Sequence, residues 1–456
     1  MTLKKIIEYG SYLFLFILPW QTRWIFHAGI IQGGTSEYLN YSLYGSDVIA
    51  LALLLLAGLY FWRLRGFGRR ADRVKGIIAA CAGAYFAFSI AQAPDRALAE
   101  FVALRLALAI AMVRLSLVFA EKTRAAFWLA AGLVLPAWLA VWQFLTQSTF
   151  ANKWLGLTRH IAAEPGTSVI ERYPLGQLPE RWLRAYGSFD HPNILGGAMA
   201  VGLIFALWLL AEWYYSKEKD NLRLLLYVII ASLSAGLFVS FSRGAWLGLF
   251  LGTAISLLIT VWLKRWRELR PWLVGVAVIA AIFAFFMVPF RDLATSRFTA
   301  QDRLELKSTS ERLGSYRQAS ALLKGHWLAG VGLGNYVPAL ERTEPSQPAW
   351  YYQPVHNTFL LLLSEFGLVG LLMIILILGT FVFKDQLPPF IQLSKEQLKI
   401  RKLIEDYGRF DLSITAATVS IGTMMLFDHW WWSLHFGVFL FWAIVSLAAL
   451  PKKTVE

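Results

Sequence analysis

The chain has 456 residues, of which 57% are hydrophobic, 15% aromatic and only 16% charged. This composition excludes a set of ordinary soluble domains and is typical of a protein that crosses a membrane several times. The formal net charge of +14 suggests nucleic-acid binding as an alternative, so the placement of the positive charges along the chain has to decide between the two.

Twelve apolar stretches each approach the ~20 residues that a helix needs to cross the ~30 Å hydrocarbon core of a bilayer. We therefore predict an all-α, polytopic membrane protein that forms a single integral membrane domain over residues 1–456. The first stretch is not followed by a small-residue cleavage site, so we expect it to stay attached. The predicted spans lie near residues 6–20, 46–62, 76–92, 98–119, 125–147, 194–215, 223–240, 244–263, 271–289, 357–380, 411–427 and 435–450.

Positive charges gather in every second connection between these spans. With both termini inside, more than half of the 43 Lys and Arg fall in inner segments, above all in RLRGFGRRADRVK (63–75) and KRWRELR (264–270). This is the positive-inside pattern, so the net charge indicates orientation and not a nucleic-acid partner. We expect both termini to be cytoplasmic and the chain to contact membrane lipids.

Two outer connections are long, at 148–193 and 290–356, and both are expected to be ordered. The second contains STSERLGSYRQASALLKGHW, in which Ser308 and Glu311 have the spacing of a capping box. Leu313, Tyr316 and Leu323 recur near the helical period, so we predict an amphipathic helix at the membrane surface.

Two further segments carry no binding motif. GVGLGNY (330–336) fits neither of the glycine spacings that bind nucleotides, and its glycines are predicted to allow tight turns before Pro338. Residues 384–410 mix Lys and Glu and are predicted to form a cytoplasmic helix or linker.

Polar groups that suit proton transfer lie on one side of the predicted membrane. All seven histidines fall on the outer side or at its boundary, and histidine is the side chain best suited to proton transfer near neutral pH. RAYGSFDHPNILGG places Arg184, Asp190, His191 and Asn193 just before the sixth span, with Pro192 at a helix start. These residues could bind a substrate or could only build the turn.

The segment SFSRGAWLG forms a very short outer turn with Ser240, Ser242 and Arg243. An arginine at a helix N-terminus offers an anion both a guanidinium group and unpaired backbone N–H groups. The alternative is an arginine that reaches toward lipid head groups.

The segment YYQPVHNTFLLLLSEFGLVG (351–370) places His356 and Asn357 where a helix should begin. The helix dipole there disfavours the imidazolium, so a neutral ring is available to accept a proton. Glu365 lies on the opposite helix face and deeper, so it is predicted to be a buried structural partner of another helix.

The last outer turn, FDHWWWSLHFG (427–437), contains Asp428 and His429. Its three tryptophans are interpreted as an aromatic belt at the membrane boundary. Arg105 lies within the fourth span and is a candidate partner of Glu365. The histidines lack metal-ligand spacing, so we predict no metal ion.

The order of these motifs resembles that of the O-antigen ligase and polymerase superfamily over roughly residues 180–440. The motifs are, in chain order, DHPN, S-x-S-R-G, R-x-x-x-Y with GVGLGN, H-N-x-x-L with E-x-G-x-x-G, and DH. The resemblance implies an inverting, metal-independent membrane glycosyltransferase without a cofactor. Such an enzyme takes a glycan from an undecaprenyl diphosphate carrier and passes it to a hydroxyl acceptor, which in ligases is the lipid A core.

The resemblance also implies roles for individual residues and a location. It makes Arg184, Arg243 and Arg312 diphosphate ligands and His356 the candidate general base, on the periplasmic side of the bacterial cytoplasmic membrane. The same motifs supply the supporting residues His191, Asn193, Ser242, Asn357, Asp428 and His429.

Two alternatives remain open from the sequence. A polymerase would use the same donor but a second lipid-linked glycan as acceptor, and the motifs do not separate it from a ligase. A small-anion transporter should place its polar groups near the membrane midplane on broken helices, whereas here most of them gather at one rim.

Overall fold

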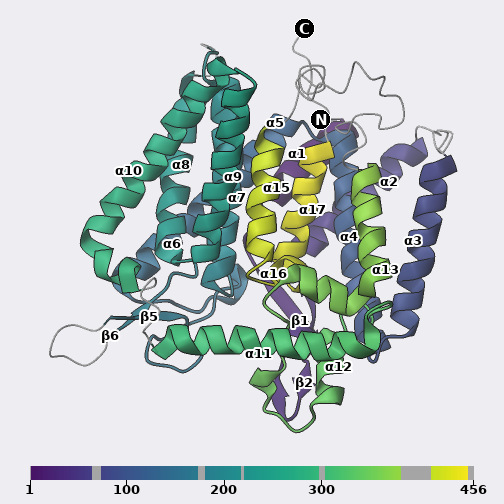
Figure 1. Ribbon diagram of the computed structural model, residues 1–456. Coiled ribbons are helices and arrows are strands. Elements are labelled where there is room, and N and C mark those ends of the chain that lie inside the picture. Colours follow the sequence, from purple (N-terminus) through teal and green to yellow (C-terminus); the bar gives the residue numbers. More distant parts are fainter. Residues whose placement is uncertain are drawn as a thin grey trace.

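The computed structural model describes residues 2–63, 73–172, 180–216, 220–296, 303–381 and 412–449. The chain in these ranges is mostly helical, as predicted, and most of its helices run roughly side by side in one bundle (Figure 1). The predicted cytoplasmic segment, residues 384–410, lies outside the described residues.

Within the described ranges, eight helical segments are long and apolar enough to cross a membrane. They are α2 (Gly45–Arg63), α4 (Arg96–Phe119), α5 with α6 (Lys122–Gly132 and Val134–Thr146), α7 (Pro192–Trp213), α8 (Asp220–Ser240), α9 (Arg243–Trp262), α10 (Trp266–Ser296) and α13 (Thr358–Phe381). The protein is therefore a multi-pass membrane protein.

Four further helices occupy the remaining predicted spans, and three of them contain shorter apolar stretches, Gly76–Ala91, Leu412–Met425 and His435–Ala448. The four helices are α1 (Leu3–Ile17), α3 (Arg73–Ala91), α15 (Leu412–Met425) and α17 (His435–Ala449). An apolar helix thus lies at each of the twelve predicted ranges, with α5 and α6 sharing one of them. Whether all twelve cross the membrane stays a prediction.

Helix α7 is the centre of the bundle. It is buried from Ile194 to Leu210, because its sequence is apolar on every side and a helix of that kind is stable only inside other helices. Helices α5, α8, α9, α10 and α15 pack around it. The first turn of α7 is therefore fixed in position, which matters because polar motif residues lie there.

One end of the bundle is crossed by α11 (Arg303–His326), and we call it the α11 end (Figure 1). This is the predicted amphipathic helix, but it begins before Ser308, so the predicted capping box was wrong. Its buried face consists of Ser315, Ala319 and Leu322, whereas Leu313 is exposed. The short helices α12 (Tyr336–Thr343) and α16 (Trp430–Ser433) lie at the same end.

Three small two-stranded antiparallel sheets were not predicted. Strands β1 (Arg23–His27) and β4 (Tyr41–Tyr44) pair with each other and enclose β2 (Ile30–Ile31) and β3 (Gly34–Thr35). We call residues 23–44 the N-terminal hairpin. Strands β5 (Val169–Arg172) and β6 (Glu180–Leu183) form the third sheet, and all of these lie at the α11 end (Figure 1).

Helix α13 is broken at Gly367, whose φ of 65° is not helical. A loop packs against the break, and Gly330 in that loop has a φ of 73°. Four backbone hydrogen bonds of 2.8 to 3.2 Å join the two segments: Val331 and Gly332 donate to the carbonyls of Ser364 and Glu365, and Leu368 and Val369 donate to those of Trp327 and Leu328. The backbone groups freed by the break are thus satisfied, as burial requires.

Replacing Gly330 with alanine should destabilise the protein. An added Cβ would lie 2.2 Å from the carbonyl oxygen of Glu365, and the positive φ is unfavourable for alanine. The combined cost should be about 2–5 kcal/mol. Thermal unfolding in detergent measures it, with Gly314→Ala in α11 as control because nothing lies within 4 Å of that Cβ. Equal melting temperatures for Gly330→Ala and wild type would contradict this account of the loop.

Candidate functional site

The DHPN motif forms a capped helix start, as its sequence suggested. His191 is the N-cap of α7, and its Nδ1 accepts the backbone N–H of Asn193 at 3.1 Å. The proton must therefore sit on Nε2, which lies 3.0 Å from Ser168 Oγ and donates to it. Burial lowers the pKa of His191 to about 3, helped by the charge of Arg184. His191 is thus a neutral helix cap.

Asn193 connects two charged groups through its side-chain amide. Its Oδ1 accepts a hydrogen bond from Nη2 of Arg184 at 2.8 Å, and its Nδ2 donates to Oδ2 of Asp428 at 2.9 Å. Nε of Arg184 also donates to the carbonyl of Ser240 at 2.9 Å. The DHPN, S-x-S-R-G and DH motifs are therefore joined by one chain of hydrogen bonds.

The S-x-S-R-G motif forms a tight turn between α8 and α9. Phe241 adopts a left-handed φ of 47°, and Ser240 Oγ accepts the backbone N–H of Ser242 at 3.2 Å. A Cβ on Gly196 of α7 would lie 2.6 Å from Cβ of Ser242, so only glycine lets the turn pack this closely. Arg243 is half-buried and is the first residue of α9.

The HN motif docks directly onto the DH motif. Asn357 caps α13, since its Oδ1 accepts the N–H of Leu360 at 3.0 Å, and Thr358 Oγ1 donates to the carbonyl of Asp428 at 2.7 Å. These contacts bring the ring of His356 to 5.2 Å from that of His429, measured between ring centroids. Two imidazoles and a carboxylate thus meet at the α11 end.

His429 is held by two neighbours. Ser433 Oγ donates to the carbonyl of His429 at 3.1 Å, so its oxygen accepts a hydrogen bond from Nδ1–H at 2.7 Å and Nε2 is left as an acceptor. On its other side, Tyr38 of the N-terminal hairpin packs edge-on at 5.5 Å between ring centroids. No sequence pattern pointed to Tyr38, Ser433 or Thr358.

Electrostatics keep both imidazoles neutral near pH 7. Burial lowers the pKa of His356; Asp428 opposes this shift, while Arg312 on α11 adds to it. Burial lowers the pKa of His429 to about 4. Burial disfavours ionised Asp428, but His429, His356 and the amide of Asn193 favour it and hold its pKa below the usual value. The cluster therefore contains a carboxylate next to neutral imidazoles.

The same three side chains have an arrangement that a metal ion can use. One ligand atom each from His356, Asp428 and His429 lies within 4.8 Å of the others. Metal–ligand bonds of about 2.0–2.2 Å would require these atoms to move slightly closer together. Sequence spacing did not reveal this group because its members come from two distant segments.

Glu365 is buried with a partner on another helix, as predicted. Its Oε2 accepts hydrogen bonds from Nε1 of Trp432 at 2.9 Å and from the backbone N–H of Gly334 at 3.0 Å. It therefore attaches the glycine loop to α16, directly after His429. The other candidate partner, Arg105, instead lies over the rings of Phe101 and Tyr44, at 4.8 and 5.7 Å from their centroids.

The aromatic-belt interpretation of the three tryptophans was wrong. Trp430 and Trp431 are 2% and 1% exposed and stack on each other in the core, with centroids 4.0 Å apart. Gly197 allows this packing, since a Cβ there would lie 2.4 Å from the ring of Trp430. The tryptophans anchor the DH turn inside the bundle.

The positions predicted for the site therefore gather at one end of the bundle, with different exposures. Arg184 is 6% exposed and hydrogen-bonded within the protein. Arg243, Arg312 and His356 are each partly exposed. His191 and Asn357 cap helices, and Asn193 connects the motifs.

The bridging amide should matter for stability. Replacing Asn193 with alanine leaves Arg184 and Asp428 without their shared partner, which should lower the free energy of unfolding by about 2–4 kcal/mol. Asn221→Ala at an exposed position in α8 is the matched control. Thermal unfolding measures both variants, and equal melting temperatures would show that the bridge does not stabilise the fold.

Comparison with known proteins supports the motif-based resemblance. Residues 225–375 match the family model described as O-antigen ligase. This range includes the S-x-S-R-G, GVGLGN and HN motifs and Glu365. No curated protein matches the chain in a sequence search. Residues 225–375 are thus similar to the O-antigen ligase family, and this match supports the resemblance to the O-antigen ligase and polymerase superfamily.

Proposed function

We propose that the protein is an inverting glycosyltransferase that moves a glycan from undecaprenyl diphosphate to a hydroxyl group, with the lipid A core as acceptor. The reaction takes place at the α11 end, which faces the periplasm from the cytoplasmic membrane, and both termini are cytoplasmic. The observation that carries the proposal is the hydrogen-bond chain from Arg184 through Asn193 to Asp428, beside His356.

The donor's diphosphate binds to arginines. A diphosphate leaving group gains negative charge as the glycosidic bond breaks, and preorganised positive groups stabilise that charge most effectively where water is scarce. Arg243 offers a guanidinium together with the N-terminus of the 20-residue helix α9. Arg312 on α11 lies near enough to His356 for its charge to act on that ring, and buried Arg184 adds its charge from within the protein.

The acceptor hydroxyl loses its proton to His356. The ring is neutral near pH 7 because burial lowers its pKa, so it can accept a proton. The nearby carboxylate of Asp428 then stabilises the imidazolium that forms. His356 removes the proton on one side of the anomeric carbon, and the arginines stabilise the diphosphate on the other side. The acceptor oxygen can therefore displace the diphosphate directly, which inverts the configuration at the anomeric carbon.

His356→Ala and Arg243→Ala should each lower glycan transfer by at least about 100-fold, because a general base and an anion-stabilising group each contribute roughly that much. Purified variants are assayed with a lipid-diphosphate glycan and lipid A core. The exposed residues His326 and Arg96 provide matched alanine controls. Near-normal transfer by either site variant would disprove its assignment.

Chelation should leave the reaction unchanged, because arginines take the place that a divalent cation has in other transferases. Transfer by the purified protein is measured before and after treatment with EDTA and dialysis. We expect equal rates. A loss of activity that Zn²⁺ or Mg²⁺ restores would mean that His356, Asp428 and His429 hold a metal ion during the reaction.

A further inference from the structure

His356, Asp428 and His429 form a compact group of metal-ligating side chains, which we call the imidazole–carboxylate cluster. Histidine spacing along the chain argued against a metal ion, but the fold places one ligand atom of each residue within 4.8 Å of the other two. The two segments are held together by the hydrogen bond of 2.7 Å from Thr358 Oγ1 to the carbonyl of Asp428. The cluster is therefore a product of the tertiary fold.

His429 is oriented as metal-ligating histidines usually are. Its Nδ1–H donates to Ser433 Oγ at 2.7 Å. Such a hydrogen bond fixes the tautomer and the orientation of a ligating ring. Among the described residues, no hydrogen bond is made to Nε2 of His429. The lone pair of Nε2 can therefore bind an ion without breaking a contact.

The carboxylate of Asp428 is also supported by its neighbours. Its Oδ1 accepts the backbone N–H of His429 at 2.8 Å, and its Oδ2 accepts Nδ2–H of Asn193 at 2.9 Å. Each carboxylate oxygen has two lone pairs, so each keeps one for another partner. Ligating carboxylates are commonly held by hydrogen bonds of this kind. Two of the three ligands are thus already oriented.

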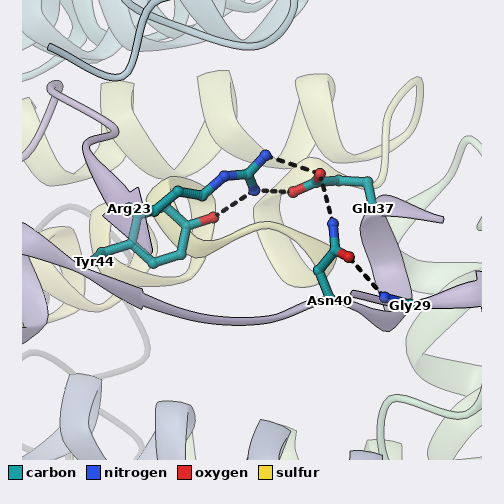
Figure 2. A network of polar contacts seen from close by, with 5 residues as sticks. All are labelled: Arg23, Gly29, Glu37, Asn40 and Tyr44. Carbon is teal, nitrogen blue, oxygen red and sulfur yellow. Dashed lines mark hydrogen bonds and ion pairs between the residues drawn. The ribbon is translucent and has the colours of Figure 1, made fainter. Parts of the chain in front are cut away.

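The N-terminal hairpin supports the other side of His429. Tyr38 packs edge-on against that ring, with centroids 5.5 Å apart. Hydrogen bonds and an ion pair on both sides of Tyr38 fix its segment (Figure 2), and they join Arg23, Glu37, Tyr44, Asn40 and Gly29. His429 is therefore held between the hairpin and Ser433.

The cluster can close around an ion with a small adjustment. Ligand atoms around a tetrahedral ion lie roughly 3.3–3.6 Å apart, given bonds of about 2.0–2.2 Å. His429 is 4% exposed, whereas His356 and Asp428 are partly exposed and can be reached from outside. The ring of His356 can supply the movement, because no hydrogen bond holds it among the described residues.

The ligand set selects the kind of ion. Two imidazole nitrogens with one carboxylate suit Zn²⁺, and three protein ligands leave a fourth position for water. Mg²⁺ and Ca²⁺ need mostly oxygen ligands, of which this cluster has few. The charge of Arg184, which is joined to Asp428 through the amide of Asn193, opposes every cation. Only an ion that gains from imidazole ligands should therefore bind.

We propose that His356, Asp428 and His429 bind Zn²⁺ reversibly and that the bound ion inhibits glycan transfer. The inhibition rests on the proposed function. Zn²⁺ competes with the proton for the lone pair of His356, and it neutralises the carboxylate that would stabilise the imidazolium. The ion is an inhibitor and not a cofactor, so transfer should still be insensitive to chelation.

The binding test uses the full-length protein, purified without a polyhistidine tag. Zn²⁺ is titrated into the wild type and its variants in a calorimeter, and thermal unfolding verifies that each variant is folded. His356→Ala and His429→Ala should each weaken binding at least about tenfold, because each removes one of three ligands. His27→Ala and His326→Ala are the controls, since both histidines are exposed and lie outside the cluster. They should bind Zn²⁺ as the wild type does.

The inhibition test uses the wild type in the transfer assay. Zn²⁺ at ten times its measured dissociation constant should lower the rate to about a tenth, and EDTA should restore it. The same concentration of Mg²⁺ or Ca²⁺ should have no effect.

The outcomes separate the inference from the proposed function. No measurable binding of Zn²⁺, or equal binding by the wild type and both cluster variants, would overturn the inference and leave the proposed function standing. Binding at the cluster with unchanged transfer would overturn the inhibition and also the role of His356 as base. If Zn²⁺ binds through the cluster and the protein transfers nothing even in EDTA, the metal site survives and the proposed function fails.

Discussion

The side-chain amide of Asn193 is the contact on which the site depends. An amide accepts at one end and donates at the other, so it can link a guanidinium to a carboxylate without letting them pair directly. Arg184 is thereby kept at a fixed position, and Asp428 keeps its charge for the neighbouring imidazoles. Direct pairing of the two ions would neutralise that carboxylate and move it away from His356.

This bridge works only because α7 is rigid. Its apolar sequence places it at the centre of the bundle, where Gly196 and Gly197 admit the S-x-S-R-G turn and Trp430 at close range. Motifs far apart in the sequence are thus brought to the first turn of one helix. The buried core therefore fixes the relative positions of the polar groups, as preorganised catalysis requires.

The sequence allowed the helical bundle, the capped start of α7 and the convergence of motif residues at one end to be predicted, because periodicity and capping are local properties. It did not reveal Tyr38, since nothing in a short hairpin indicates which distant ring it will touch. The sequence also suggested, wrongly, that the tryptophans lie at the membrane boundary. A run of tryptophans fits a membrane boundary and a buried core equally well, and only the close packing of Trp430 against Gly197 in the structure distinguishes the two positions.

The break in α13 bears on the alternative of a transporter. Broken helices in transporters leave backbone groups free to bind a solute. Here the freed groups at Gly367 are bonded to residues 327–332, and Glu365 accepts from Gly334 and Trp432. The break thus joins the glycine loop to α13, and the four backbone groups that make these hydrogen bonds are not left to bind a solute.

The central claim is that arginines at the α11 end hold the departing diphosphate beside a neutral imidazole. A structure of the purified protein with undecaprenyl diphosphate bound tests it most directly. The account predicts both phosphates within hydrogen-bonding distance of Arg243 and Arg312, with the free end of the diphosphate toward His356. Density for the diphosphate at the opposite end of the bundle, near Arg265 and Arg267, would contradict it.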